Sequence, residues 1–310
     1  MRYFDLHCDT MTECALKNIP LRRNLLHVDL DTVQGWERYV QCYAVWLPDE
    51  LRGEPAWQRF LQVAERFSQE VEKNAGCLRQ LRAPGDLDSL EESGRHGAIL
   101  TVESSAVLGG RLERIQDLRR LGVRMCTLTW NGENAIGSGS QTHHGLTAFG
   151  REAVRELIRQ GIVLDVSHLN DRGFWDLMEE TDAPVAASHS NARALCPHRR
   201  NLTDSQAREI ARRGGLVGLN YSAPFLRSDG RPAEFEDVYR HAAHFLELGL
   251  EHCLALGSDF DGADLPPCLD GCEKVPELGR YLEEKLGRDT AEKILWKNAW
   301  DFFDRQTQNR

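Results

Sequence analysis

The sequence predicts an α/β protein with an eight-stranded parallel barrel surrounded by helices, the (β/α)8 or TIM-barrel fold. Eight short apolar segments alternate with longer amphipathic segments along the chain, which indicates parallel strands joined by right-handed helical crossovers. The chain has 310 residues, a length that suits one such barrel. Eight units are also the number at which this kind of sheet closes on itself, whereas an open doubly wound sheet is the alternative.

The strand candidates are rich in valine, leucine, isoleucine and aromatic residues, and several of them follow a glycine or a proline, as strand starts often do. A connection longer than the others separates the second candidate from the third. In chain order the expected strands are Tyr3–Cys8, Tyr39–Leu47, Ala98–Glu103, Arg124–Trp130, Ile162–His168, Pro184–His189, Leu216–Tyr221 and Cys253–Asp259.

The segments between the strands have the spacing of amphipathic helices. Two of the helices follow capping-box signatures, formed by Thr203 with Gln206 and by Asp289 with Glu292. No long linker interrupts the chain, so we expect a single domain over residues 1–310. The expected helices are Trp57–Lys73, Arg111–Leu121, Gly145–Gln160, Asp171–Thr181, Ala207–Arg213, Glu234–Leu248, Val275–Lys285 and Ile294–Phe303.

The composition excludes several classes of function. The chain carries 38 basic and 48 acidic residues, a net charge of −10, which argues against binding to nucleic acid or to an anionic membrane. Its apolar runs are far shorter than the ~20 residues of a membrane-spanning helix, and the N-terminus lacks the apolar core of a signal peptide. Nine scattered cysteines do not suggest a disulfide framework. We therefore expect a cytoplasmic protein.

The carboxyl ends of the predicted strands carry the residues that are able to bind a metal or transfer a proton. In such a barrel the catalytic groups gather at this end. His7 and Asp9 are two residues apart, so their side chains point to one side, and a histidine with a carboxylate suits a divalent metal. Glu103 follows an apolar run, where an ionised carboxylate is unfavourable unless it is paired or bound. For each residue alone, a structural strand end or a surface loop is the alternative.

The later strands supply further candidates. His168 and His189 end two successive strands, each directly after a serine, and Asp259 ends the last strand. Together the strand ends offer enough ligands for two divalent ions that share one carboxylate. Two such ions roughly 3.5–4 Å apart lower the pKa of a shared water and polarise a scissile carbonyl. Asp259 would then move a proton to the leaving group.

These motifs resemble the membrane dipeptidase (renal dipeptidase) family of zinc metallopeptidases, within the amidohydrolase-like barrels. The resemblance runs nearly end to end and is carried by the segments DLHCDT, VESS, VLDVSH, SHSNARALCPHRRNLTD, GGLVGLN and LGSDFDG. It implies a dinuclear zinc enzyme that hydrolyses dipeptides, with relatives that tolerate a D-residue at the C-terminal position.

The resemblance also implies a role for each candidate residue. His7 and Asp9 would bind the first zinc, Glu103 would bridge both ions, and His168 and His189 would bind the second. Asp259 would be the acid–base carboxylate. Arg200 would hold the C-terminal carboxylate of the dipeptide, a task that suits the forked guanidinium group.

Two positions depart from the family pattern. Many relatives have Thr-His at the end of the fourth strand, whereas Thr129 is followed here by Trp130 and Asn131. The role of that histidine beside the substrate carbonyl would pass to Trp130, Asn131 or a loop histidine, or be lost. Relatives often have Asn-Phe-Tyr after the seventh strand, whereas this chain has Asn-Tyr-Ser, which makes Tyr221 a candidate for substrate contact.

Two rival functions remain open from the sequence. One is a barrel amidohydrolase that acts on another amide, a lactone or a cyclic substrate, for which a carboxylate anchor at Arg200 would be unnecessary. The other is a metal-binding but inactive scaffold, which only the departure at Trp130 supports. The expected partner is a small dipeptide substrate, and a homodimer is compatible with the sequence.

Overall fold

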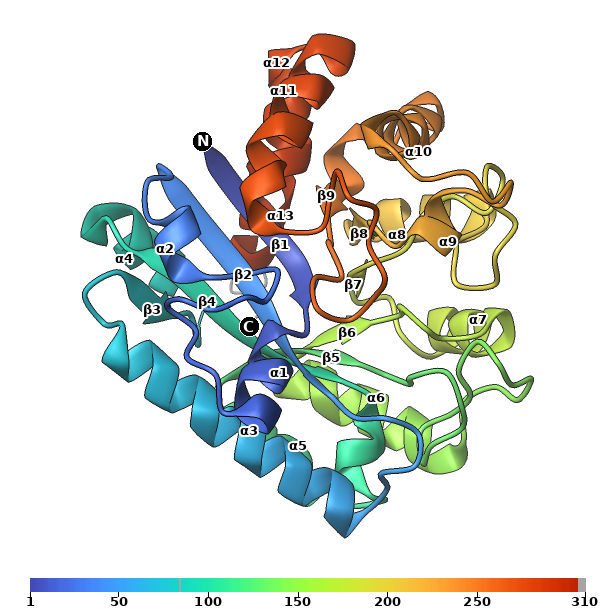
Figure 1. Cartoon of the computed structure of the whole chain (residues 1–310). Coiled ribbons are helices and arrows are strands. Elements are labelled where there is room, and N and C mark those ends of the chain that lie inside the picture. The colour runs from blue at the N-terminus through green and yellow to red at the C-terminus, as the bar shows by residue number, and fades with distance from the viewer. Residues whose placement is uncertain (84, 306–310) are drawn as a thin grey trace.

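The computed structural model of the chain describes residues 1–83 and 85–305, so the last five residues of the expected domain lie outside it. Eight parallel strands form a closed barrel, in which β9 returns to pair with β1 through Leu256 and Asp5. This closure confirms the predicted fold, and Figure 1 shows the strands with the helices around them. The barrel strands are β1 (Arg2–Cys8), β2 (Arg38–Trp46), β4 (His96–Glu103), β5 (Val123–Thr127), β6 (Val163–Asp165), β7 (Val185–Ala187), β8 (Leu216–Leu219) and β9 (Leu254–Leu256).

Strands β5 to β9 end two or three residues earlier than the sequence predicts. The residues beyond them leave the sheet and line or support the mouth of the barrel. His168 and Asp259 have φ angles of +70° and +64°, which a strand does not allow. The apolar runs therefore predicted the strands correctly, but they also included the first loop residues at the barrel mouth.

The long connection between β2 and β4 holds helix α3 (Glu54–Lys73), a short strand β3 (Leu78–Gln80) and helix α4 (Asp86–Ser93). β3 pairs with the first half of β4, while β5 pairs with the second half. The sequence analysis missed β3, because three residues with one apolar side chain give no periodic pattern. The connection is thus an addition beside the barrel and does not form a ninth barrel strand.

Most predicted helices are present. The capping box at Thr203 and Gln206 opens α8 as expected. The one predicted at Asp289 and Glu292 is wrong, because α12 already begins after Gly287, whose φ is +81°. The helices are α1 (Thr10–Lys17), α2 (Leu30–Val33), α3 (Glu54–Lys73), α4 (Asp86–Ser93), α5 (Glu113–Leu121), α6 (Ala148–Arg159), α7 (Asp171–Glu180), α8 (Asp204–Arg212), α9 (Ala223–Leu226), α10 (Phe235–Glu247), α11 (Val275–Leu286), α12 (Arg288–Glu292) and α13 (Asn298–Arg305).

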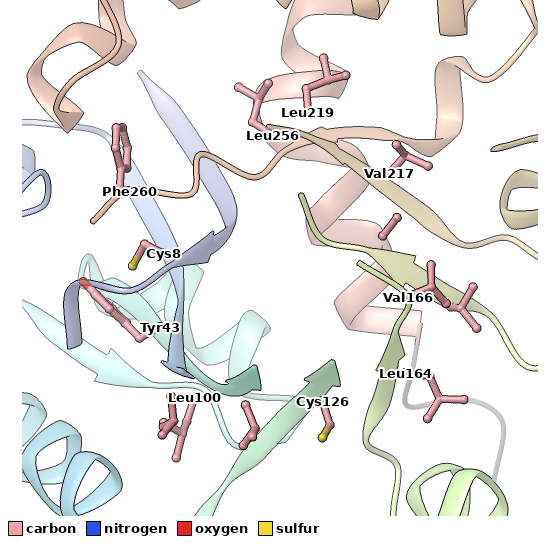
Figure 2. Close-up of a cluster of buried hydrophobic side chains, with 14 of the residues drawn as sticks. Cys8, Tyr43, Leu100, Cys126, Leu164, Val166, Val217, Leu219, Leu256 and Phe260 are labelled. Atoms are coloured by element: carbon pink, nitrogen blue, oxygen red, sulfur yellow. The ribbon is translucent and has the colours of Figure 1, made fainter. Parts of the chain in front are cut away.

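Two apolar clusters hold the barrel together. The larger one includes Tyr43, Leu164 and Leu256, and Figure 2 shows part of it. The smaller one joins side chains of the strands to α13, where Phe303 stacks on Phe4 with ring centroids 5.4 Å apart. Arg124, at the start of β5, donates to the carbonyl oxygen of Phe303. Helix α13 therefore covers the amino-terminal end of the barrel and leaves the carboxyl end for chemistry.

None of the helices in the described part of the chain combines the length and the apolar character that crossing a membrane requires.

Candidate active site

A cavity of about 330 Å³ opens at the carboxyl ends of the barrel strands. The segments that follow the barrel strands each contribute to it or to the histidines behind it, so residues far apart in the sequence meet there. Its lining residues are Asp9, Glu13, Trp46, Glu103, Trp130, Asn131, His168, Arg200, Ser222, Phe225, Asp259, Asp261, Gly262 and Ala263. Most of the site residues predicted from the sequence are among them, and His7 and His189 are buried directly behind.

The first group of side chains that could hold a metal ion surrounds His7. Its Nε2 atom lies 3.5 Å from Asp9 Oδ2, 3.6 Å from Glu103 Oε2 and 3.8 Å from Asp259 Oδ1. Among the described residues this buried nitrogen has no hydrogen-bond partner, and neither has Asp9 Oδ1. Buried polar atoms are normally satisfied. Donor atoms that converge at these distances without bonding to one another fit a cation placed between them.

The electrostatics of this group favour a positive charge at the same point. Burial alone lowers the pKa of His7, but the nearby carboxylates, Glu103 first, outweigh burial and raise that pKa to about 10. Burial and the charges of Asp9 and Asp259 hold the pKa of Glu103 well above its ordinary value. A buried cluster of acids needs a compensating cation, and a divalent ion would supply it without a proton.

The second group consists of His168 and His189 on the other side of Glu103. Their Nε2 atoms lie 3.0 Å apart, and Glu103 Oε1 lies 2.8 Å from the first and 3.6 Å from the second. Burial holds the pKa of both histidines far below the ordinary value, so they are neutral, the form that binds a metal. Glu103 thus turns one oxygen toward each group, as a bridging carboxylate does.

Outer hydrogen bonds orient both histidines. His189 Nδ1 lies 2.7 Å from Ser188 Oγ, and that hydroxyl donates to Asp165 Oδ2 at 2.7 Å. Because the hydroxyl proton is used on Asp165, Ser188 Oγ accepts from Nδ1–H, which leaves the Nε2 lone pair free. Asn131 Oδ1 lies 3.0 Å from His168 Nδ1 and has the same effect there. Such outer partners fix the tautomer of metal-binding histidines.

Asp165 is fully buried and also accepts hydrogen bonds from Thr127 Oγ1, the Ser167 amide and the Ser188 amide. The sequence analysis missed Asp165 and Ser188 as supports of the site. The signal was present, because a carboxylate inside the apolar run VLDVSH must be hydrogen-bonded to be stable there. Asp5 plays a similar part at the other side of the barrel, where it accepts from the amide and the hydroxyl of Ser258.

Several residues around the cavity have a left-handed backbone conformation, which directs their side chains toward the site. Ser104, His168, Asp259 and Asp261 all have positive φ angles, and strain of this kind concentrates at functional sites. Gly262 lies against the first group, and a Cβ atom there would be 2.1 Å from Asp9 Oδ2 and 2.6 Å from Asp259 Oδ1. Any larger residue would therefore displace the carboxylates.

One carboxylate oxygen of Asp259 faces the site, and the other accepts a hydrogen bond. Its Oδ2 accepts from Asn220 Nδ2 at 3.0 Å, whereas Oδ1 faces His7. The residue lines the cavity and is only 7% exposed. This carboxylate is therefore oriented by Asn220 and open to a molecule in the cavity.

Arg200 is a buried cation that lines the same cavity, with its guanidinium group 5.5 Å from the centre of the Phe225 ring. Within the described chain, its Nε and Nη2 atoms are buried and make no hydrogen bond. Burial lowers the pKa of Arg200 to about 10, so the group stays charged near neutral pH. A buried charge without a partner is strongly unfavourable, and an anionic ligand would satisfy it.

The chain matches the family model of membrane dipeptidases, peptidase family M19, over residues 1–309. It belongs to this family. The match confirms the resemblance drawn from the motifs, and it makes the chain a metallo-dipeptidase.

The chain is also similar to individual proteins, among them a dipeptidase and a metallopeptidase. An uncharacterized protein in the pqqA 5′ region of Klebsiella pneumoniae is 35% identical over 245 residues, 75% of this chain and 90% of that protein. The dipeptidase tcpJ of Claviceps purpurea is 29% identical and is matched over 88% of this chain and 68% of its own length. A metallopeptidase of Rhodobacter sphaeroides, solved with a phosphinate mimic of L-Ala-D-Ala, is 28% identical with a TM-score of 0.92, and the match covers 99% of each chain.

Trp130 forms an aromatic wall of the cavity. Its ring lies edge-on to Trp46, with centroids 5.4 Å apart, and 6.2 Å from the ring of His168. Both tryptophans line the cavity. The sequence analysis did not select Trp46, because it ends a strand that offers no ligand.

Tyr221 does not reach the cavity, and its selection as a substrate contact needs correction. Its side chain is fully buried, its hydroxyl lies 3.1 Å from that of Tyr3, and its ring packs edge-on against Phe260. The next residue, Ser222, lines the cavity instead. Side chains of consecutive extended residues point to opposite sides, so one step along the chain separates the core position from the cavity position.

Proposed function

We propose that the enzyme hydrolyses the peptide bond of dipeptides with the help of two divalent ions bound at the two groups described above. Zinc is the metal that we propose for both. His7, Asp9 and Glu103 would hold one ion, and Glu103, His168 and His189 the other. The observation that carries the proposal is the position of Glu103, whose two carboxylate oxygens face two separate sets of buried donor atoms. When bound, such ions lower the pKa of a water molecule and polarise the scissile carbonyl.

The protein's own groups would then move the proton and hold the substrate. Asp259, fixed by Asn220 at Oδ2, would accept a proton from the attacking water and deliver it to the nitrogen of the leaving amino acid. Ser188 and Asn131 keep the two histidines in the tautomer that exposes Nε2. Trp130 closes the cavity on one side and favours substrates that pack against an aromatic surface.

Arg200 would bind the C-terminal carboxylate of the dipeptide, because it is the buried cation of the cavity whose donors lack partners. This favours a dipeptide over a lactone or another neutral substrate, which would leave the guanidinium unpaired. The Rhodobacter relative binds a mimic of L-Ala-D-Ala, which supports dipeptides with a C-terminal D-residue as substrates here.

Replacing Arg200 by alanine tests this role. We expect kcat/KM for a dipeptide to fall by roughly 10- to 150-fold, equivalent to the ~1.5–3 kcal/mol of a charged hydrogen bond. The corresponding dipeptide amide, which lacks the carboxylate charge, should be a poor substrate for the parent enzyme and nearly insensitive to the substitution. Equal losses on the acid and on the amide would show that Arg200 has a structural role only.

We also propose that the enzyme works in a reducing, cytoplasmic environment. All nine cysteines are free in the described structure, and most of them are buried, as is usual for proteins of that compartment. Fractionation of the source cells would test the location. A homodimer stays a proposal as well, which light scattering of the purified protein would decide.

A further inference from the structure

We propose that the enzyme prefers dipeptides whose N-terminal residue has a long basic side chain, and that Glu13, Trp46 and Trp130 form the pocket that selects it. This inference rests on the proposed function, because it takes Arg200 as the anchor of the C-terminal carboxylate. It goes further by assigning the opposite side of the cavity to the side chain of the N-terminal residue.

The barrel topology sets the direction of the substrate. Around the closed sheet, β7 is four strands away from β2 in either direction, so these strands lie on opposite sides of the barrel, as can be followed in Figure 1. Arg200 lies in the segment after β7, and Trp46 is the last residue of β2. A dipeptide with its carboxylate on Arg200 therefore extends across the mouth toward Trp46.

Glu13 occupies the first turn of α1 and lines the same cavity as Trp46 and Trp130. Its neighbour Thr12 ties α1 to the end of β2, since Thr12 Oγ1 accepts from the Trp46 amide at 3.0 Å and donates to the Ala44 carbonyl oxygen at 2.9 Å. The start of α1, where Glu13 lies, is thus tied by hydrogen bonds to the end of β2, where Trp46 lies.

The exposure of Glu13 suits an ionic contact with a substrate. Its side chain is 21% exposed, whereas Lys17, its ion-pair partner on the same helix, is 57% exposed. An ion pair with one partner as exposed as Lys17 contributes little to stability, so a substrate ammonium group can share the carboxylate or displace the lysine. Lys17 itself is not part of the cavity lining, so the pair leaves the pocket open.

The other carboxylates of the cavity are already engaged. Asp9 and Glu103 are proposed metal ligands, and Asp259 is the proposed acid–base group. Asp261 accepts from the hydroxyl of Thr10 at Oδ2 and from the His27 amide at Oδ1. This leaves Glu13 as the carboxylate of the cavity that is suited to a cationic side chain.

The chemistry of the pocket matches lysine and arginine. Both bury their methylene chains on apolar surfaces while the charged end stays near water, and tryptophan is the aromatic side chain that attracts cations most strongly. A neutral chain of the same length would gain only the contact with the tryptophans, and an acidic one would be repelled by Glu13.

The test compares dipeptides that differ only at the N-terminal residue: lysyl-alanine, norleucyl-alanine and glutamyl-alanine. For the zinc-loaded parent enzyme we expect kcat/KM to be about tenfold higher for the lysyl than for the norleucyl substrate, a factor typical of a partly exposed cation contact. Glu13→Gln should bring this ratio close to one, and Glu13→Lys should turn the preference toward glutamyl-alanine. Trp46→Ala should raise KM for the lysyl and norleucyl substrates alike.

Glu113→Gln is the matched control, because Glu113 also lies in the first turn of a helix and pairs with an arginine, Arg111, but is not part of the cavity lining. This variant should keep the parent ratio. If Glu13→Gln weakened all three substrates equally, Glu13 would serve the α-ammonium group common to every dipeptide, and the proposal would be wrong. A parent ratio near one would overturn the inference alone, whereas a zinc-loaded parent that hydrolyses no dipeptide would overturn the proposed function.

Discussion

Asp259→Asn is expected to lower kcat by about 10²–10⁴-fold, the usual contribution of a general acid–base group, with the metal content unchanged. Asparagine has nearly the same shape and still accepts the hydrogen bond from Asn220, but it cannot take up and release the proton. The measurement is kcat for a dipeptide together with metal analysis of the same preparation.

Asp261→Asn provides the control for this prediction. Asp261 lies two residues further along, lines the same cavity and also has a positive φ, but its oxygens are bound by Thr10 and His27. We expect less than about a tenfold change in kcat, because no proton transfer is lost. An Asp259→Asn enzyme that is fully loaded with metal and turns over at the parent rate would refute the acid–base role.

Glu103→Ala should have the second of the two largest effects. Both donor groups meet at this carboxylate, so its removal should weaken both ions and lower kcat/KM by roughly 10³-fold or more, since the ions supply several kcal/mol of transition-state stabilisation. Zinc per chain after dialysis and kcat/KM measured at saturating zinc check this expectation.

Glu103→Gln separates charge from shape in the same position. It keeps the volume of the side chain and removes the negative charge that a bridging ligand contributes, so it should also lose metal. Retention of two tightly bound ions together with full activity in either variant would show that Glu103 is not the bridge.

The sequence predicted the barrel because its eight barrel strands, including the short ones at residues 163–165 and 185–187, are buried and mostly apolar. It predicted strand ends less well, since His168 and Asp259 follow such runs without a break and leave the sheet only through a left-handed backbone conformation. That conformation depends on the tertiary hydrogen bonds of the barrel mouth, which no local pattern contains. β3 was missed for the opposite reason, because it is too short to have a pattern.

The predicted metal-binding residues lie together in the structure because they stand at or just beyond the carboxyl ends of four parallel strands, with His7 and Asp9 sharing the end of β1. The residues that form the rest of the cavity wall could not be predicted from the strand ends. Trp46 and Glu13 come to line one cavity because Thr12 ties α1 to the end of β2. Tyr221 is buried in the core, whereas Ser222 lines the cavity. Such details depend on how α1 docks and on how the chain turns after β8.

The measurement that tests the dinuclear site most directly is a zinc titration of enzyme freed of metal by a chelator, with dipeptide hydrolysis and bound zinc recorded at each step. The two donor groups on either side of Glu103 predict that activity is absent without metal and reaches its plateau at two bound ions per chain. Full activity at one bound ion or fewer, or hydrolysis by the metal-free protein, would contradict this account.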